Sequence, residues 1–281
     1  MLHRTLTLLS ATLLPVALTA CGGSKASDAP APLVAEAPTG KEVEIKLNLA
    51  KGDKKALVAK INVDMDIKAG RDKNKVGMVM GMDMGFEVLD VDADGNHEMS
   101  FTFDRMKMAM SGMPQEVDYD SSRPGSEDTP VGMEISPMLG FPITMTMTPT
   151  GEIKDIGDMS DAPQILRTQF DQGQNNMEMV ATYPKVPVDN GDTWTLERTQ
   201  NDSGIEMTMK ATYTLLEHND KKVRVGVSGK LSGGMAGWLH GEMDIDPATG
   251  WVRSATMKMQ AAGEQDGQEM EMVTDMSFSD S

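Results

Sequence analysis

The chain has 281 residues but only one cysteine and four histidines, and aromatic residues make up just 4% of it. A single cysteine, Cys21, excludes an intramolecular disulfide and a multi-cysteine metal site. The sequence also lacks a Gly-x-Ser-x-Gly nucleophile elbow, a His-Glu-x-x-His zinc motif and a phosphate-binding glycine loop. We therefore expect a protein that is not an enzyme and that carries no cofactor.

Positive charge is also scarce. The chain has 26 lysines and arginines against 43 aspartates and glutamates, a formal net charge of −17. An acidic surface repels phosphate backbones, so we expect no nucleic-acid partner. The acidity is explained by solubility, and an acidic binding face is the alternative.

The longest apolar run lies at the N-terminus. Residues 5–17 follow the basic Arg4 and are mostly apolar, but the run is shorter than the roughly 20 residues that a permanent transmembrane helix needs. It matches the hydrophobic region of a signal peptide. The next residues, Leu18-Thr19-Ala20-Cys21, resemble the lipobox of bacterial lipoproteins.

This resemblance implies a signal peptide of residues 1–20, cleavage after Ala20, and palmitate-like acyl chains on Cys21. Several acyl chains together make a stable membrane anchor. Gly22, which is not an aspartate, favours the outer membrane over the inner one under the sorting rule of enteric bacteria, with the protein facing the periplasm. An ordinary secretory signal is the alternative.

Composition then divides the rest of the chain. Residues 21–42 are rich in Gly, Ser, Ala and Pro, which predicts a flexible tether. Residues 43–281 carry the regular apolar pattern and are expected to form a single β domain.

Within this domain, apolar and polar residues alternate with a period of two, which is typical of strands with one buried face. The runs are residues 43–49, 61–67, 76–88, 99–110, 143–147, 207–215, 223–227, 243–245, 255–259 and 270–278. Short connections between consecutive runs predict an antiparallel sheet. The alternation changes parity near Asp104-Arg105, which predicts a β-bulge.

Two stretches depart from the alternation. Residues 161–172 place Ile165, Leu166 and Phe170 on a helical face, with Asp161 as a plausible N-cap. Residues 111–142 are rich in Pro, Gly, Ser and Asp and are expected to form a long loop.

The two halves of the domain resemble each other. Residues 77–82 and 86–90 align with residues 204–209 and 213–217 at constant register, and Gly52-Asp53 matches Gly191-Asp192. We infer two meander half-repeats, about 43–157 and 185–281, with the helix between them. The expected fold is mainly β, a strongly curved antiparallel sheet or open β-barrel with one central helix. Chance similarity of two amphipathic meanders is the alternative.

Several of these features together resemble a family of exported bacterial proteins described only as a domain of unknown function. The resemblance covers most of residues 43–281 and rests on turn and strand residues. Its residues are Gly52-Asp53, Tyr119-Asp120-Ser121, Tyr183-Pro184, Gly191-Asp192-Thr193-Trp194 and Asp246-Pro247-Ala248-Thr249-Gly250. The layout is also similar to lipoprotein carriers of the LolA, LolB and LppX kind, in which a curved sheet cups a lipid. That likeness is architectural and transfers no residue roles.

Methionine is unusually abundant, with 27 residues. Most of them occupy apolar strand positions, which indicates core packing. A Cu(I) site is one alternative, because thioether sulfur is a ligand that Cu(I) prefers. The cluster for such a site is Met106, Met108, Met110 and Met113. Copper proteins usually combine Met with His in irregular segments, so we expect no metal site here.

A deformable binding face is the other alternative, because flexible Met side chains adapt to variable apolar ligands. The residues that would line such a face are Met78, Met80, Met82, Met84, Met207, Met209, Met257 and Met259.

A further motif resembles the first half of a calcium loop, with Asp90, Asp92 and Asp94 followed by Gly95. The twelfth position is Phe101, where a calcium loop requires a bidentate Glu. Asp94-Gly95 is also a common hairpin turn between strands. We favour the structural turn over calcium binding.

Taken together, the sequence predicts a membrane-anchored envelope lipoprotein without catalysis that binds a lipid or other apolar ligand in a Met-lined cup. A structural or interaction role with a fully packed core is the alternative.

The lipobox generates a direct prediction. Changing Cys21 to Ser removes the acylated sulfur, so the protein should lose its acyl chains and leave the membrane fraction. Membrane fractionation and intact-mass measurement check both effects. A variant that stays in the membrane with the mass shift of the parent protein would show that Cys21 is not the anchor.

Overall fold

The computed structural model describes residues 29–70, 72–171, 182–202, 205–265 and 267–281. The predicted signal peptide, residues 1–20, and Cys21 lie outside these ranges. In the described part of the chain, no helix is both long and apolar enough to cross a membrane.

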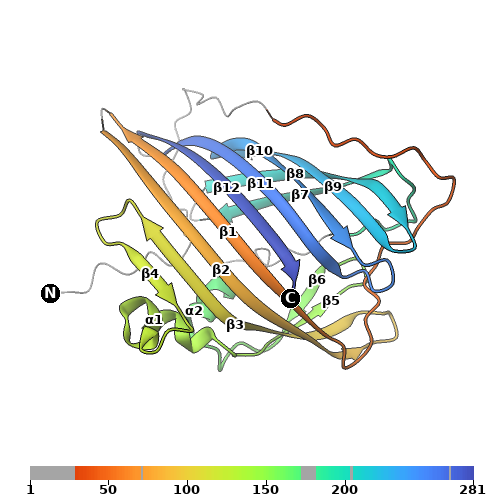
Figure 1. The fold of residues 1–281 in the computed structure, drawn as a ribbon, viewed down its shortest axis with the longest axis horizontal. Coiled ribbons are helices and arrows are strands. Elements are labelled where there is room, and N and C mark those ends of the chain that lie inside the picture. The colour runs from red at the N-terminus through yellow and green to blue at the C-terminus, as the bar shows by residue number, and fades with distance from the viewer. Residues whose placement is uncertain (1–28, 71, 172–181, 203–204, 266) are drawn as a thin grey trace.

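The fold is mainly β and consists of one twelve-stranded antiparallel sheet that curves strongly, as Figure 1 shows. The strands are β1 (Lys54–Ala69), β2 (Asp72–Val91), β3 (His97–Ser111), β4 (Val117–Asp120), β5 (Ile143–Met147), β6 (Ile153–Ile156), β7 (Thr193–Asp202), β8 (Ile205–Asn219), β9 (Lys222–Gly233), β10 (Met235–Ile245), β11 (Val252–Gln265) and β12 (Gln268–Asp280). The helices are α1 (Pro130–Ile135) and α2 (Gln164–Asp171), with 3₁₀ turns η1 (Ser126–Asp128) and η2 (Ser136–Met138).

The strand order is β6-β5-β3-β2-β1-β12-β11-β10-β9-β8-β7, with β4 paired to β3. The first and last strands are therefore neighbours in the middle of the sheet, in a register that runs from Leu57 opposite Asp280 to Ala69 opposite Gln268. The edge strands β6 and β7 do not pair with each other in the described residues, so the sheet is open. This confirms the predicted curved antiparallel architecture.

The two ends of the strands differ. Four hairpins turn at one end of the strands, which we call the rim end. They are β1–β2, β7–β8, β9–β10 and β11–β12. The turns near residues 92–96, 148–152, 220–221 and 246–251 lie at the other, which we call the packed end. In Figure 1 the rim end of β1 and β2 lies at the upper left and their packed end at the lower right.

The packed end is closed by two extended segments, residues 43–49 and 182–190. They pair with each other through Val43 and Val188. They also reach both halves of the sheet: Leu47 N donates to Pro149 O at 2.8 Å, and Asn48 N donates to Thr249 O at 2.9 Å. The segments thus cross between the β5–β6 turn and the β10–β11 turn, where the sheet itself does not close.

The prediction of a strand at residues 43–49 was therefore wrong in one respect. The segment is extended and buries Ile45, Leu47 and Leu49, as the alternation predicts. It joins no ladder, however, and carries only the bridge at Val43. Alternation shows only that one side of a segment is buried. Here the buried side chains pack on the concave face of the sheet, and the segment itself is not one of its strands.

Two other boundaries need correction. The helix begins at Gln164, so Asp161 lies in the preceding turn and is not its N-cap; the end predicted at residue 172 lies outside the described residues. The segment 111–142 is not all loop, because it contains β4, η1, α1 and η2. Thr129 caps α1 by accepting a hydrogen bond from Gly132 N, and Pro130 follows at the first helical position, a combination typical of helix starts.

The predicted bulge is confirmed. Asp83 of β2 lies opposite Arg105 of β3, whereas the next residue, Met84, lies opposite Phe103. Asp104 is therefore the extra residue, and the inward parity changes there from Phe103 to Met106.

The internal repeat appears as a recurring corner of the backbone. At its first occurrence, Gly52 has φ +88° and donates to Val88 O at 2.8 Å, while Val88 N donates to Asp53 O at 2.9 Å. The Asp53 carboxylate accepts a hydrogen bond from Ala50 N at 2.8 Å, which closes the turn.

The second occurrence has the same bonds. Gly191 has φ +90° and donates to Leu215 O at 2.8 Å, Leu215 N donates to Asp192 O at 3.0 Å, and Asp189 N donates to the Asp192 carboxylate at 2.8 Å. A register shift follows in both cases, after Val88 and after Leu215. The two Gly-Asp positions that match in sequence therefore make equivalent hydrogen bonds.

Part of the predicted tether contacts the domain. Glu36 N donates to Leu216 O at 2.9 Å, and the Asp189 carboxylate accepts hydrogen bonds from Thr39 N and Gly40 N. Burial raises the pKa of Asp189, but the hydrogen bonds from Thr39, Asn190 and Gly40 outweigh burial and lower that pKa to about 2. Asp189 thus stays ionised and holds this part of the linker at neutral pH.

Because the crossing segment closes the packed end, we expect one glycine there to be intolerant of substitution. Gly250 has φ +66°, and a Cβ there would overlap the Lys46 carbonyl of the crossing segment. Gly250→Ala should therefore lower the free energy of unfolding by about 3 kcal/mol or more, because strain and overlap add. Urea denaturation measures the change.

Gly191→Ala is the matched control, because Gly191 has a similar φ of +90° but open space around its Cβ position. Only the conformational strain applies, so we expect a loss of about 1–2 kcal/mol. Equal losses in the two variants would contradict the close approach of residues 43–49 to the β10–β11 turn.

Candidate ligand-binding face

The concave side of the sheet is filled at the packed end and partly exposed toward the rim. On β1, Leu57 and Ala59 are buried, whereas the same face continues toward the rim with Ile61, Val63, Met65 and Ile67, all partly exposed. The opposite face of β1 carries exposed polar residues such as Lys60 and Asp64. On β1, the exposure of the apolar concave side chains therefore increases from the packed end to the rim end.

The gradient recurs on β2, whereas on β9, β10 and β11 the concave side chains of Leu231, Met235 and Ala261 near the rim are buried. On β2, Met84 is 6% exposed and Met82 is 7% exposed, whereas Met80 and Met78 are partly exposed. We call the partly exposed concave region the rim-end face. Its residues are Ile61, Val63, Met65, Ile67, Met78, Met80, Met207, Met209, Met257, Met259, Met270, Met272 and Met276.

Cross-strand register aligns these side chains in rows over four adjacent strands. One row is Met80, Ile61, Met276 and Met257. The next row toward the rim is Met78, Val63, Thr274 and Met259. A smaller buried cluster of Leu231, Met235 and Ala261 supports Met207, Met209, Met259 and Met272 from β8 to β12.

The eight methionines proposed from the sequence all lie on the concave side, but not at one level. Met78, Met80, Met207, Met209, Met257 and Met259 belong to the rim-end face. Met82 and Met84 lie deeper, in the packed core.

Sequence reasoning missed four methionines of this face: Met65, Met270, Met272 and Met276. Their alternation was visible, but their position depends on the pairing of β1 with β12. It also missed Thr274, whose signal is a polar residue at the apolar parity of β12, between Met272 and Met276.

A charged side chain also lies on the concave side. Arg198 of β7 lies opposite Met209 of β8. Burial lowers the pKa of Arg198, while the nearby Tyr213 and Glu152 raise it. Tyr213 stacks on Trp194 at a centroid distance of 5.5 Å, so this edge of the sheet is more rigid and polar than the methionine rows.

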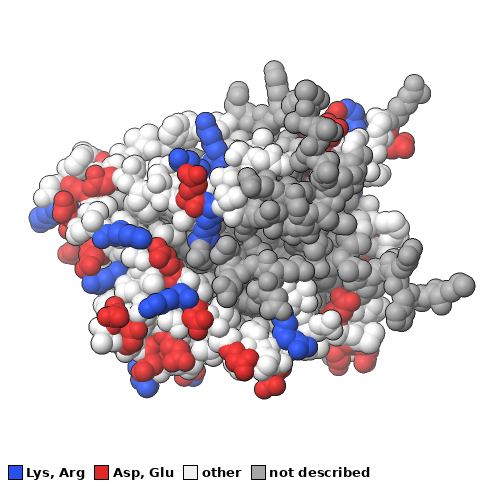
Figure 2. Space-filling view, turned by 180° about the vertical axis from the view of Figure 1, so that it is seen from behind, with Lys and Arg blue, Asp and Glu red and all other residues white. Residues whose placement is uncertain are grey.

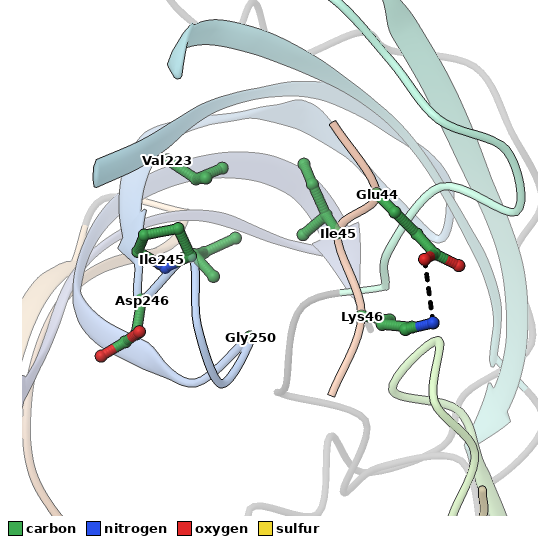
Figure 3. A pocket seen from close by; sticks show the side chains of 8 residues that line it. Glu44, Ile45, Lys46, Val223, Ile245, Asp246 and Gly250 are labelled. Atoms are coloured by element: carbon green, nitrogen blue, oxygen red, sulfur yellow. Dashed lines mark ion pairs between the residues drawn. The ribbon is translucent and has the colours of Figure 1, made fainter. Parts of the chain in front are cut away.

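A separate small pocket lies at the packed end, among Ile45, Val223, Ile245 and Gly250, beside a Lys46–Glu44 ion pair of 2.8 Å (Figure 3). Its enclosed space is about 10 Å³, which is room for about one water molecule. Sites for small ligands have volumes of roughly 300–1,000 Å³, so this pocket is too small for a lipid.

The residues of the copper alternative lie on or beside β3. Met106 and Met108 are buried on its concave side, and Met110 and Met113 are partly exposed. In the described part of the chain, no three His, Cys, Asp or Glu side chains gather as metal ligands. The prediction that Met106 and Met108 serve packing therefore agrees with their burial.

The calcium-like motif forms a turn through its own side chains. The Asp92 carboxylate accepts hydrogen bonds from Asp94 N, Asn96 N and Asn96 Nδ2, at 2.9, 2.8 and 2.7 Å. The bonds from Asn96 hold the pKa of Asp92 below its usual value. Asp90 forms an ion pair with Lys51 at 3.2 Å. The carboxylates of Asp90 and Asp92 thus have partners within the protein, as a structural turn requires.

Surface charge shows no single acidic face in the visible region. Figure 2 shows Asp and Glu interspersed with Lys and Arg. Cross-strand ion pairs such as Lys54–Glu87, at 3.1 Å, account for part of this pattern. Exposed pairs of this kind add little stability, so the negative charge is best explained by solubility.

The motif residues behind the family resemblance have structural roles. The buried Tyr183 donates its hydroxyl hydrogen to Gly250 O, and burial raises the pKa of Tyr183 well above its usual value. Trp194 Nε1 donates to Thr182 O at 2.7 Å. Asp120 accepts from Ser122 and pairs with Lys107 at 3.1 Å, which holds β4 against β3. These residues maintain the scaffold around the concave face.

The profile of a family of unknown function, DUF6263, matches residues 94–178 and 164–272. These matches together span more than half of the chain. The protein belongs to the DUF6263 family. No sequence among curated proteins matches it significantly.

Solved structures similar to this DUF6263 protein include lipovitellin, which was solved in a study of its lipid–protein interactions. The TM-score is 0.54 at 10% identity, and the match covers 83% of this chain and 25% of lipovitellin. The chain thus spans about a quarter of that protein's length, and the likeness concerns the fold alone.

Two bacterial structures match more weakly. One is a putative outer membrane lipoprotein-sorting protein domain from Vibrio parahaemolyticus, with a TM-score of 0.16, 12% identity, and coverage of 79% of this chain and 84% of that chain. The other is a DUF1329 family protein from Desulfovibrio piger, with a TM-score of 0.18, 11% identity, and coverage of 81% and 86%. These scores are too low to support a conclusion.

The exposure gradient predicts an order of methionine oxidation by hydrogen peroxide, because sulfoxide formation follows accessibility. Met133 on α1 is 62% exposed and should react first. Met80 and Met209 should follow, and Met84 and the fully buried Met99 should react last. Peptide mass spectrometry over a time course measures the order. Equal rates at Met80 and Met84 would contradict the gradient.

Proposed function

We propose that this DUF6263 protein is a lipid-anchored envelope protein that holds the acyl chain of a lipid on its rim-end face, without catalysis. One observation carries the proposal: the concave side is packed at one end, and toward the other end partly exposed apolar side chains line it on β1, β2, β8 and β12. Contiguous exposed apolar patches on a protein often mark binding sites.

The size and chemistry of the rim-end face fit an acyl chain. From Ile61 to Ile67 the face follows β1 for about 20 Å at the usual rise of a strand. Its side chains are Met, Ile and Val, with Thr274 among them, and they offer no charge to the ligand. Each Å² of apolar surface covered contributes about 25 cal/mol, so a ligand chain along these rows has a substantial driving force.

Methionine suits a ligand whose shape varies. Its unbranched thioether side chain changes rotamer easily and keeps favourable contacts with different apolar partners. In one row, Ile61 lies between Met80 and Met276. A stiffer β-branched side chain is thus flanked by two adaptable ones. Such a surface favours acyl chains as a class over one rigid ligand.

The predicted anchor supports the same function. Fifteen residues separate Cys21 from Glu36, whose backbone contacts Leu216. A fully extended chain of that length reaches about 50 Å. Acylation at Cys21 would therefore keep the domain close to a membrane surface, which is a source of acyl chains.

A tryptophan scan on one strand tests the proposal. Met80→Trp on the rim-end face should fill open space, cost less than about 1 kcal/mol of unfolding free energy, and block binding of the hydrocarbon probe diphenylhexatriene. The fluorescence of this probe increases in apolar surroundings. Titration of the soluble domain with the probe, together with urea denaturation, gives both readouts.

Met84→Trp is the matched control on the same face of β2. Met84 is only 6% exposed, so the larger ring should overpack the core and destabilise the domain by about 1–3 kcal/mol. If both variants are destabilised alike and the parent protein binds no probe, the core is packed throughout and the structural role replaces the binding function.

A further inference from the structure

One polar atom lies unpaired in the middle of the rim-end face. Thr274 occupies the concave side of β12, between Val63 of β1 and Met259 of β11. Its side chain is 5% exposed, and Oγ1 has no hydrogen-bond partner. Buried hydroxyl groups in native proteins are almost always paired, so an exception requires a physical explanation.

Packing does not explain the hydroxyl. The other members of this row, Met78, Val63 and Met259, are apolar. A valine at position 274 would have the same branched shape, suit a strand equally well, and bury no unpaired polar atom. The hydroxyl thus destabilises the free protein without improving its fold.

Other unpaired buried atoms in the described residues lie elsewhere. His97 Nδ1 and Trp251 Nε1 belong to large rings within the packed core, where the ring itself fills space. Those of Arg105 and Arg224 belong to side chains on the convex side, and Asp244 Oδ1, also on that side, lies 3.4 Å from Lys222 Nζ in an ion pair. Thr274 Oγ1 is the unpaired atom that lies on the rim-end face.

We propose that the lipid held on the rim-end face is a neutral acyl ester, and that Thr274 donates its hydroxyl hydrogen to the ester carbonyl oxygen. This inference rests on the proposed function and adds the ligand's polar group to it. Met259, beside Thr274 in the row, and Met272 and Met276, two residues away on β12, are flexible enough to move aside and open access to Oγ1.

The surroundings favour a neutral group over a carboxylate. The positions in the Thr274 row and in the next row, Met80, Ile61, Met276 and Met257, are all uncharged. A carboxylate at this depth would lie buried among uncharged side chains, and Arg198, the charged residue described on the concave side, is five strands away from β12 in the sheet, so ionisation there is strongly unfavourable. Thr274 also lies six residues from the rim at Gln268, about 20 Å along the strand, so the ester lies well below the rim.

The test compares three fluorescent polyenes that differ in their polar group: diphenylhexatriene, the methyl ester of cis-parinaric acid, and cis-parinaric acid itself. Thr274→Val should weaken binding of the methyl ester about tenfold, the effect of one lost hydrogen bond, and leave the affinity for diphenylhexatriene within about twofold. Thr274→Ser retains a hydroxyl and should restore ester binding. Thr274→Val should also unfold at a higher urea concentration than the parent protein.

The outcomes separate the two proposals. If the parent protein does not bind diphenylhexatriene, the proposed function fails. If it binds that probe but Thr274→Val leaves ester affinity unchanged, or weakens only the acid, the ester assignment fails while the proposed function stands. A Thr274→Val variant that unfolds at lower urea would show that the hydroxyl has a structural role, and would also overturn the assignment.

Discussion

The pairing of β1 with β12 is the interaction on which the rest of the structure depends. It joins the first and last strands over a long ladder and turns two meanders into one continuous sheet. Without it, the rows that run from Met80 through Ile61 and Met276 to Met257 would be split between two separate sheets. Two smaller sheets would also have two additional exposed edges, which favour aggregation. The long-range ladder therefore creates both the stability of the domain and its candidate binding face.

The open sheet divides its concave side between stability and binding. At the packed end, the crossing segments at residues 43–49 and 182–190 bring apolar side chains and backbone hydrogen bonds to the gap between β6 and β7. Toward the rim, the same face remains partly exposed. Inward glycines on β10 help the sheet to curve: a Cβ at Gly237 or Gly241 would overlap the backbone of β11. The curvature gives a concave surface without requiring a closed barrel.

The family relationship has a consistent physical basis. The residues that carry the resemblance lie at turns and corners: the Gly52-Asp53 and Gly191-Asp192 corners make equivalent hydrogen bonds in the two halves. Tyr183 and Gly250 join the crossing segment to the β10–β11 turn. Residues of this kind hold the framework around the concave face in place.

The sequence by itself determined the properties that depend on neighbouring residues: nine of the twelve strands (all but β4, β6 and β7), which face of each is apolar, where the bulge at Asp104 lies, and that Asp90 to Asn96 form a turn. These follow from local sterics, alternation and short-range hydrogen bonds. It did not determine that residues 43–49 cross the sheet instead of joining it, because both arrangements bury alternate side chains. Nor did it reveal that Thr274 lies unpaired between Val63 and Met259. Only the tertiary structure decided these points, because they depend on which strands pair across more than 200 residues of chain, and no local pattern encodes that choice.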